Sequence, residues 1–129
     1  TLATAISQRL VRRLCPECKK ERLYTEEEKR IMNSIGEKYG TKFDLNGVTY
    51  DAIGCKHCNN TGYYSRIGVF EILNVTDEIK QLIMEGKSSI EIRKEALKNG
   101  YRPLVVDGIN KVIQGYTSLT ELNNKLLFF

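Results

Sequence analysis

The sequence lacks any long apolar run and any marked excess of one charge. Its uninterrupted apolar stretches, such as Leu104–Val106, fall far short of the roughly 20 residues that a membrane-spanning helix needs. Lys and Arg outnumber Asp and Glu by only 20 to 16, so the formal net charge of +4 does not by itself indicate a nucleic-acid partner. No segment shows a signal-peptide pattern, and the first residue is Thr1 and not Met. These absences predict a piece of a larger cytoplasmic protein with no membrane span.

Histidine is also scarce, which limits the chemistry that the chain can perform. The one histidine, His57, lies between two cysteines, and no Ser/His/Asp, Cys/His or paired-carboxylate arrangement is present that would support catalysis by itself. With 129 residues, of which 41% are hydrophobic and 28% charged, the chain has the size and composition of one modest folded domain. We therefore predict that the chain is not an enzyme on its own.

Cysteine carries the most specific signal in the sequence. Two pairs, Cys15–Cys18 and Cys55–Cys58, each have two intervening residues. This spacing lets a tight turn aim both sulfurs at one ion while backbone N–H groups hydrogen-bond to the sulfurs, and two such turns form the closed tetrahedral site that structural zinc prefers. After the second pair, Asn59, Asn60 and Gly62 tolerate left-handed backbone. The predicted zinc ligands are Cys15, Cys18, Cys55 and Cys58.

Other uses of four cysteines stay open at this point. Mononuclear iron, a redox dithiol and unligated core cysteines are the alternatives, and His57 could replace one thiolate. Disulfides are disfavoured because secretory features are missing, and a catalytic zinc is disfavoured because it needs an open coordination position. A structural zinc with His57 exposed at the tip of its turn is the interpretation that the spacing favours.

The first part of the chain has two helical patterns. Apolar residues recur at helical spacing over Leu2–Leu14, which predicts a helix leading into the first cysteine pair. Thr25–Glu28 has the sequence of a capping box, and the short helix that it opens is expected to be broken by Gly36 and Gly40.

The rest of the chain passes from strands to helices. Alternating apolar residues predict strands over Val48–Ile53 and Tyr63–Leu73, which we expect to pair beside the metal. Capping residues and glycines then predict four helices, namely Asp77–Glu85, one from Ser88 to about Asn99, one from Pro103 to Gly115 and one after Ser118. The predicted fold class is α+β and mainly helical, with a small zinc-knuckle element, a short β-hairpin or sheet, and a C-terminal helical bundle.

Two further motifs suggest phosphate binding, and neither does so strongly. Gly86–Ser88 resembles the end of a phosphate-binding loop, but Gln81 stands where the required first glycine would be, so a helix stop followed by an N-cap is the better interpretation. Basic residues cluster around the first cysteine pair, where they could contact phosphates or a partner protein; the candidates are Arg9, Arg12 and Arg13, with Lys19, Lys20 and Arg22 nearby. The low net charge and the lack of interleaved aromatic residues argue against nucleic acid.

Five segments, in this order, resemble one family. Ser7–Cys18 (SQRLVRRLCPEC), Gly54–Tyr63 (GCKHCNNTGY), Arg66–Leu73 (RIGVFEIL), Asp107–Val112 (DGINKV) and Gly115–Leu122 (GYTSLTEL) are similar to the C-terminal part of the ATPases that power type II secretion and type IV pilus assembly. The resemblance covers nearly the whole chain.

The resemblance implies a three-part organisation and a parent motor. Residues 1–14 would be the terminal helix of a truncated RecA-like motor domain, residues 15–75 a tetracysteine zinc-binding subdomain, and residues 76–129 a C-terminal helical subdomain. The parent would be a cytoplasmic homo-hexamer, peripheral at the inner face of the membrane, in contact with an inner-membrane platform protein. ATP and Mg²⁺ would bind only to the parent, and the domain itself would provide structural and force-transmitting contacts. The competing hypotheses are a zinc-ribbon module that binds nucleic acid and a thiol-disulfide protein.

Overall fold

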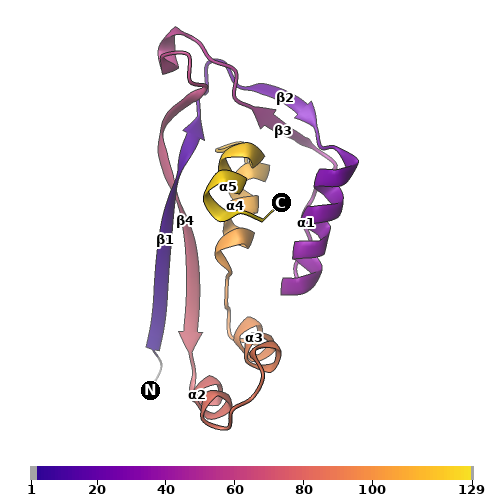
Figure 1. Cartoon of the computed structure of the whole chain (residues 1–129), viewed down its shortest axis with the longest axis vertical. Coiled ribbons are helices and arrows are strands. Elements are labelled where there is room, and N and C mark those ends of the chain that lie inside the picture. Colours follow the sequence, from indigo (N-terminus) through magenta and orange to yellow (C-terminus); the bar gives the residue numbers. More distant parts are fainter. Residues whose placement is uncertain (1–2, 129) are drawn as a thin grey trace.

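A two-stranded ribbon runs along one long side of the molecule. The structure is a computed structural model that describes residues 3–128. Strand β1 (Ala3–Leu14) pairs antiparallel with β4 (Tyr63–Val75) along its whole length. Figure 1 shows the ribbon on one side, helix α1 (Glu26–Tyr39) on the other, and α4 (Leu104–Ile113) and α5 (Leu119–Leu126) between them. The two cysteine-bearing turns lie at one end of the ribbon, as the positions of β1 and β4 require.

The helix predicted over Leu2–Leu14 is wrong, because residues 3–14 form β1 and Leu2 lies outside the described residues. The apolar spacing that suggested a helix does not mark one buried face. Ile6 and Leu10 are 66% and 48% exposed, whereas Val11 is buried. What decides the conformation is the long antiparallel ladder with β4, a partner that local periodicity does not reveal.

A second, smaller sheet leads to α1. Strand β2 (Lys20–Leu23) pairs antiparallel with β3 (Val48–Asp51). Two strands near the predicted positions are present, but the prediction that they pair with each other is wrong, because β3 pairs with β2 and β4 with β1. Strand β2 was missed since its four residues are mostly charged and exposed, so they show no alternation.

The hydrophobic core is shared between the ribbon and the helices. Val11 of β1 and Val69 of β4 pack in one cluster with Met32 of α1, while α4 and α5 contribute Ile109, Val112, Leu119 and Leu122. The α+β fold class predicted from the sequence is confirmed. The C-terminal helices form two pairs, and only the α4–α5 pair joins this cluster.

The other pair lies at the end of the molecule opposite to the cysteines (Figure 1). Helix α2 (Asp77–Met84) packs against α3 (Ser89–Lys98). The capping predictions are confirmed, since the side chains of Thr25, Thr76, Ser88 and Ser118 each accept a hydrogen bond from the backbone N–H three residues on. The predicted break at Gly36 is wrong, because helix α1 continues through it to Tyr39. Gly40 is the C-cap, with left-handed backbone at φ 68°. Within residues 3–128, no helix is both long and apolar enough to cross a membrane.

A buried carboxylate ties the last helix to the first strand. Glu121 on α5 is 1% exposed, and it accepts hydrogen bonds from the backbone N–H of Arg12 at 2.7 Å and from Arg12 Nε at 3.0 Å. Thr117 Oγ1 donates to the Arg12 carbonyl at 2.8 Å, and the backbone N–H of Leu14 donates to the Tyr116 carbonyl at 2.8 Å. The outer edge of β1 is therefore capped by α5 and its N-terminal loop just before the first cysteine.

We expect Glu121→Gln to lower the free energy of unfolding by about 1–3 kcal/mol, because the buried group loses its charge-assisted hydrogen bonds with Arg12. Denaturant unfolding at neutral pH measures this loss. The matched control is Glu27→Gln on α1, whose carboxylate is 74% exposed and lies 3.8 Å from Arg30, and which should change stability by less than about 0.5 kcal/mol. Equal effects of the two variants would show that the buried contact is not the source of the stability.

Candidate metal centre

The fold brings the four cysteines into one cluster. Their sulfur atoms all lie within 4.8 Å of one another, although the two pairs are far apart in sequence. The Sγ–Sγ distance is 3.8 Å between Cys15 and Cys55, 3.9 Å between Cys18 and Cys58, and 3.8 Å between Cys55 and Cys58. All four are free thiols and not disulfides. Within residues 3–128, this is the one group of His, Cys, Asp or Glu side chains arranged closely enough to hold a metal ion.

The spacing of the sulfurs fits a tetrahedral ion. A metal–sulfur distance of about 2.3 Å at tetrahedral angles separates neighbouring sulfurs by about 3.8 Å. The three distances above agree with that value, and a disulfide would need about 2.0 Å. Four thiolates favour zinc over harder ions, and they leave no open position for a substrate.

Backbone N–H groups point at two of the sulfurs. Cys58 Sγ accepts hydrogen bonds from the N–H of Cys55 at 3.3 Å and of Gly62 at 3.2 Å. Cys18 Sγ accepts one from the N–H of Gly54 at 3.3 Å. Such bonds spread the negative charge that a thiolate carries, which is how knuckle turns stabilise a bound metal. Sequence reasoning missed Gly54; its place directly before Cys55 was the available signal.

The second turn depends on left-handed backbone. Asn59, Asn60 and Gly62 have φ of 55°, 61° and 84°, as the sequence predicted. Gly62 also links the two turns, because its N–H donates to Cys58 Sγ and its carbonyl accepts from the N–H of Cys15 at 2.9 Å. A Cβ at Gly62 would lie 2.6 Å from the Cβ of Ala52, so the position needs glycine for both conformation and space.

The electrostatics of the cluster favour stepwise ionisation. Burial raises the pKa of Cys58, but the N–H groups of Cys55 and Gly62 outweigh it and lower that pKa to about 6. For Cys18, the Gly54 N–H lowers the pKa, while burial and the neighbouring thiols raise it more, to about 11. Burial also raises the pKa of Cys15. Cys58 therefore ionises more readily than Cys15 and Cys18, and a metal that binds all four sulfurs must displace protons from those two.

The cluster is anchored to the helices as well as to the strands. Lys19, next to the first pair, donates from Nζ to the Gly115 carbonyl at 3.1 Å, and its ammonium lies 4.3 Å from the Tyr50 ring centroid. Tyr63, at the start of β4, is hydrogen-bonded through its hydroxyl to Ser118 Oγ at 2.6 Å. The cysteine turns therefore cannot move independently of β4 and the α4–α5 pair.

The other predicted site residues have different surroundings. His57 is exposed, lies outside the sulfur cluster and stacks on Tyr64 with ring centroids 4.4 Å apart. Arg12 is bound to Glu121, and Arg13 lies 5.0 Å from the Tyr116 ring centroid. Arg9 is exposed on β1. The three arginines therefore differ in their contacts within the fold.

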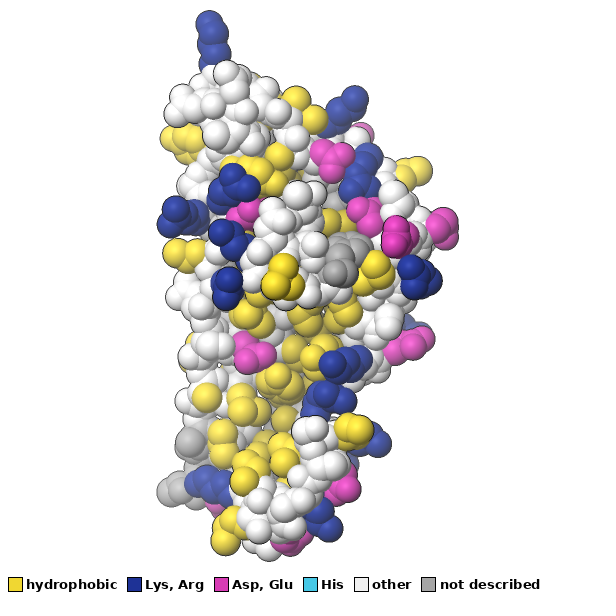
Figure 2. Space-filling model, in the orientation of Figure 1, with side chains coloured by type: hydrophobic (Ala, Val, Ile, Leu, Met, Phe, Trp, Pro, Cys, Tyr) yellow, Lys and Arg dark blue, Asp and Glu magenta, His cyan; other side chains and the backbone are white. Residues whose placement is uncertain are grey.

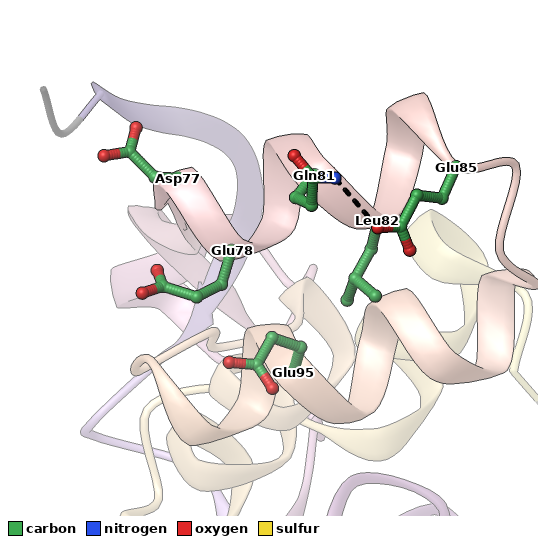
Figure 3. A pocket seen from close by; sticks show the side chains of 6 residues that line it. All are labelled: Asp77, Glu78, Gln81, Leu82, Glu85 and Glu95. Atoms are coloured by element: carbon green, nitrogen blue, oxygen red, sulfur yellow. Dashed lines mark hydrogen bonds between the residues drawn. The ribbon is translucent and has the colours of Figure 1, made fainter.

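One surface hollow lies far from the cysteines, between α2 and α3. It encloses about 450 Å³ and is lined by Asp77, Glu78, Gln81, Leu82, Glu85 and Glu95 (Figure 3). Gln81 is hydrogen-bonded to Glu85 at 2.8 Å, and Glu95 faces Lys98 at 3.9 Å. Just beyond it, the Gly86–Ser88 segment is a helix stop followed by the N-cap of α3, as the sequence predicted. The carboxylates do not form a group that could hold a metal ion.

The ribbon, the shared core and the four-sulfur cluster together define an α+β domain with a tetracysteine site. The profile of the type II/IV secretion system protein family matches residues 1–124. The chain belongs to this family.

Curated relatives share most of this chain. It is 42% identical over 118 residues to the type IV pilus assembly ATPase PilB of Pseudomonas aeruginosa, covering 92% of this chain and 20% of that protein. It is 39% identical over 122 residues to PilB of Thermus thermophilus, covering 94% of this chain and 13% of that protein. It is 33% identical over 123 residues to the type II secretion system protein E of Aeromonas hydrophila, covering 95% of this chain and 23% of that protein. The chain thus spans between 13% and 23% of the length of these three relatives.

We expect Gly62→Ala to destabilise the chain by about 1–3 kcal/mol, because the new Cβ meets Ala52 and the backbone at φ 84° becomes strained. Metal affinity should fall with it, since the Gly62 N–H contacts Cys58 Sγ. Thermal unfolding and a competitive chelator titration measure the two effects. Gly47→Ala is the control, because a Cβ there has nothing within 4 Å, and it should leave both values nearly unchanged. A Gly62→Ala protein that behaves like the control would contradict the role of Gly62.

Proposed function

We propose that the chain is the C-terminal zinc-binding domain of a hexameric ATPase that powers type IV pilus assembly or type II protein secretion. The relatives named above are ATPases of these two systems by their names. The observation that carries the proposal is the cluster of Cys15, Cys18, Cys55 and Cys58, whose sulfur spacing suits a structural zinc.

The zinc would act mechanically. Bound to all four sulfurs, it would join the turn after β1 to the turn before β4, and hydrogen bonds already tie both turns to the α4–α5 pair. A rigid unit at the end of the ribbon would transmit motion of the motor to neighbouring subunits or to a platform protein, where a flexible loop would dissipate it. The metal would supply cross-links and no reaction step, since the four thiolates fill its coordination sphere.

The rest of the parent chain would supply the motor. Residues 1–14 would join it to a RecA-like motor domain, followed by the zinc-binding subdomain of residues 15–75 and the helical subdomain of residues 76–129. ATP and Mg²⁺ would bind in the parent. The assembly would be a cytoplasmic homo-hexamer held at the inner face of the membrane by an inner-membrane platform protein.

Several basic residues near the first cysteine pair are held by contacts within the fold, which argues against the nucleic-acid alternative. Of the six near the first cysteine pair, Arg12 is bound to Glu121, and Lys19 contacts Gly115 and Tyr50. Arg22 is bound to Glu28 and Asp51. Half of the predicted basic patch is thus used inside the fold, which leaves few cations to neutralise phosphates.

We expect the purified chain to bind one zinc ion, and strong chelation to unfold the cysteine-bearing end. Cys55→Ser should weaken zinc binding by more than the roughly 10- to 100-fold typical of changes beyond the ligand shell. Elemental analysis with native mass spectrometry measures the stoichiometry, and a competitive chelator measures the affinity. Lys56→Gln, one residue away, offers no ligand and should retain zinc. A reduced, folded chain without metal would remove the zinc proposal and favour thiol chemistry.

In the parent protein, we expect Cys55→Ser to impair pilus assembly or secretion far more than ATP binding. The reason is that the proposed zinc holds a contact surface and does not touch the nucleotide. Pilus or secretion assays in cells, beside nucleotide binding by the purified parent, separate the two effects. Equal losses in both assays, or no loss in either, would refute the mechanical role.

A further inference from the structure

A cleft lies beside the cysteine cluster, away from the coordination sphere. It encloses about 290 Å³ and is lined by Arg13, Pro16, His57, Tyr64 and Ser65. At this point the β1–β4 register shifts, so that Tyr64 and Ser65 together oppose Arg13, and Ser65 takes left-handed backbone at φ 65°. Such bulges redirect side chains and occur often beside functional sites.

One wall of the cleft is a pair of stacked rings. His57 comes from the second cysteine turn and Tyr64 from the start of β4, and their rings lie 4.4 Å apart at an interplanar angle of 24°. Tyr64 is 50% exposed, and His57 is exposed as well. The pair presents a flat, largely apolar surface to solvent, a kind that anchors aromatic or aliphatic side chains at protein interfaces.

The surroundings of the cleft carry cations that the fold does not neutralise. Arg66 lies directly opposite Arg12 in the ribbon, a pairing of like charges that is unfavourable by itself. Glu121 neutralises Arg12, but within residues 3–128 the side chains of Arg13, Lys56 and Arg66 take part in no ion pair. Figure 2 shows Lys and Arg side chains gathered along the upper part of the side that carries β1. An anionic partner would complement this charge.

We propose that the cleft binds an acidic segment of a protein partner. A carboxylate of that segment contacts the Arg13 guanidinium, and a neighbouring apolar or aromatic side chain lies against the His57–Tyr64 pair. The proposal rests on the proposed function, because it supplies the contact through which the zinc-stabilised end would engage its partner. It replaces the three arginines expected from the sequence with one of them, Arg13.

The size of the cleft favours a peptide over a nucleic-acid strand. Strands of nucleic acid bind along a groove whose cations follow several successive phosphates. Here Arg12 and Lys19 are engaged by Glu121 and Gly115, and Arg13 is the one Lys or Arg among the residues that line the cleft, which has room for one or two side chains.

The test is a fluorescence-anisotropy titration of the zinc-loaded 129-residue chain with a labelled synthetic hexapeptide of alternating glutamate and phenylalanine. We expect saturable binding that weakens about tenfold in Arg13→Gln and about tenfold in Tyr64→Ala. Tyr64→Phe keeps the stacked ring and should bind like the original chain. Arg30→Gln removes the same charge on α1, and it should change binding less than about twofold. Circular dichroism confirms that each variant is folded.

Three outcomes would overturn the proposal. The first is no saturable binding of the peptide, and the second is an equal loss of binding in Arg30→Gln. The third is tighter binding of a hexathymidylate that is lost in the Arg13 and Tyr64 variants, which would indicate that the cleft binds nucleic acid. The titration uses neither ATP nor the parent motor, so a flat curve removes this contact and leaves the motor assignment standing. A chain that binds the peptide but no zinc would keep this contact and remove the zinc proposal.

Discussion

Four sulfurs have to meet at one point although the chain separates the two pairs by an entire helix and a small sheet. Their convergence requires the end of β1 and the beginning of β4 to lie together, which the long antiparallel ladder provides. Gly62 completes the closure, since one of its backbone groups contacts a sulfur of the second pair and the other contacts the first pair. The geometry of the sulfurs is thus a consequence of strand pairing, and a bound metal would in turn hold the ends of the strands.

The C-terminal helices make this end of the molecule stiff. Glu121, Ser118 and Tyr116 reach β1 and β4 just before and after the cysteine turns. Because the same α4–α5 pair also fills the core with Val11, Val69 and Met32, displacement of the turns would disturb the centre of the domain. A contact made at the cysteine end is therefore mechanically connected to the ribbon. The α2–α3 pair lies at the opposite end of the molecule and outside this core.

The secondary structure predicted from the sequence was correct where the signal is local and wrong where pairing decides. Side-chain caps such as Thr25 and Ser118 act on backbone N–H groups three residues away, so the sequence shows them directly. Residues 3–14 have apolar spacing that suits a helix, and only the presence of β4 makes them a strand. Strand β2 has no apolar alternation at all, and its conformation comes from its ladder with β3.

For the candidate site too, the features set by local sequence were predictable, and the contacts between distant segments were not. The spacing of Cys15, Cys18, Cys55 and Cys58 was enough to predict a four-sulfur cluster, because each Cys-x-x-Cys turn brings its own two sulfurs together by local geometry. The pairing of β1 with β4 then brings the two turns together. The family was likewise evident from motifs that stand in the sequence. Only the tertiary structure decided which arginines stay available, because Glu121 comes to Arg12 from the other end of the chain, and which aromatic residue lies against His57. Contacts between distant segments depend on packing in three dimensions, and residue spacing along the chain does not record it.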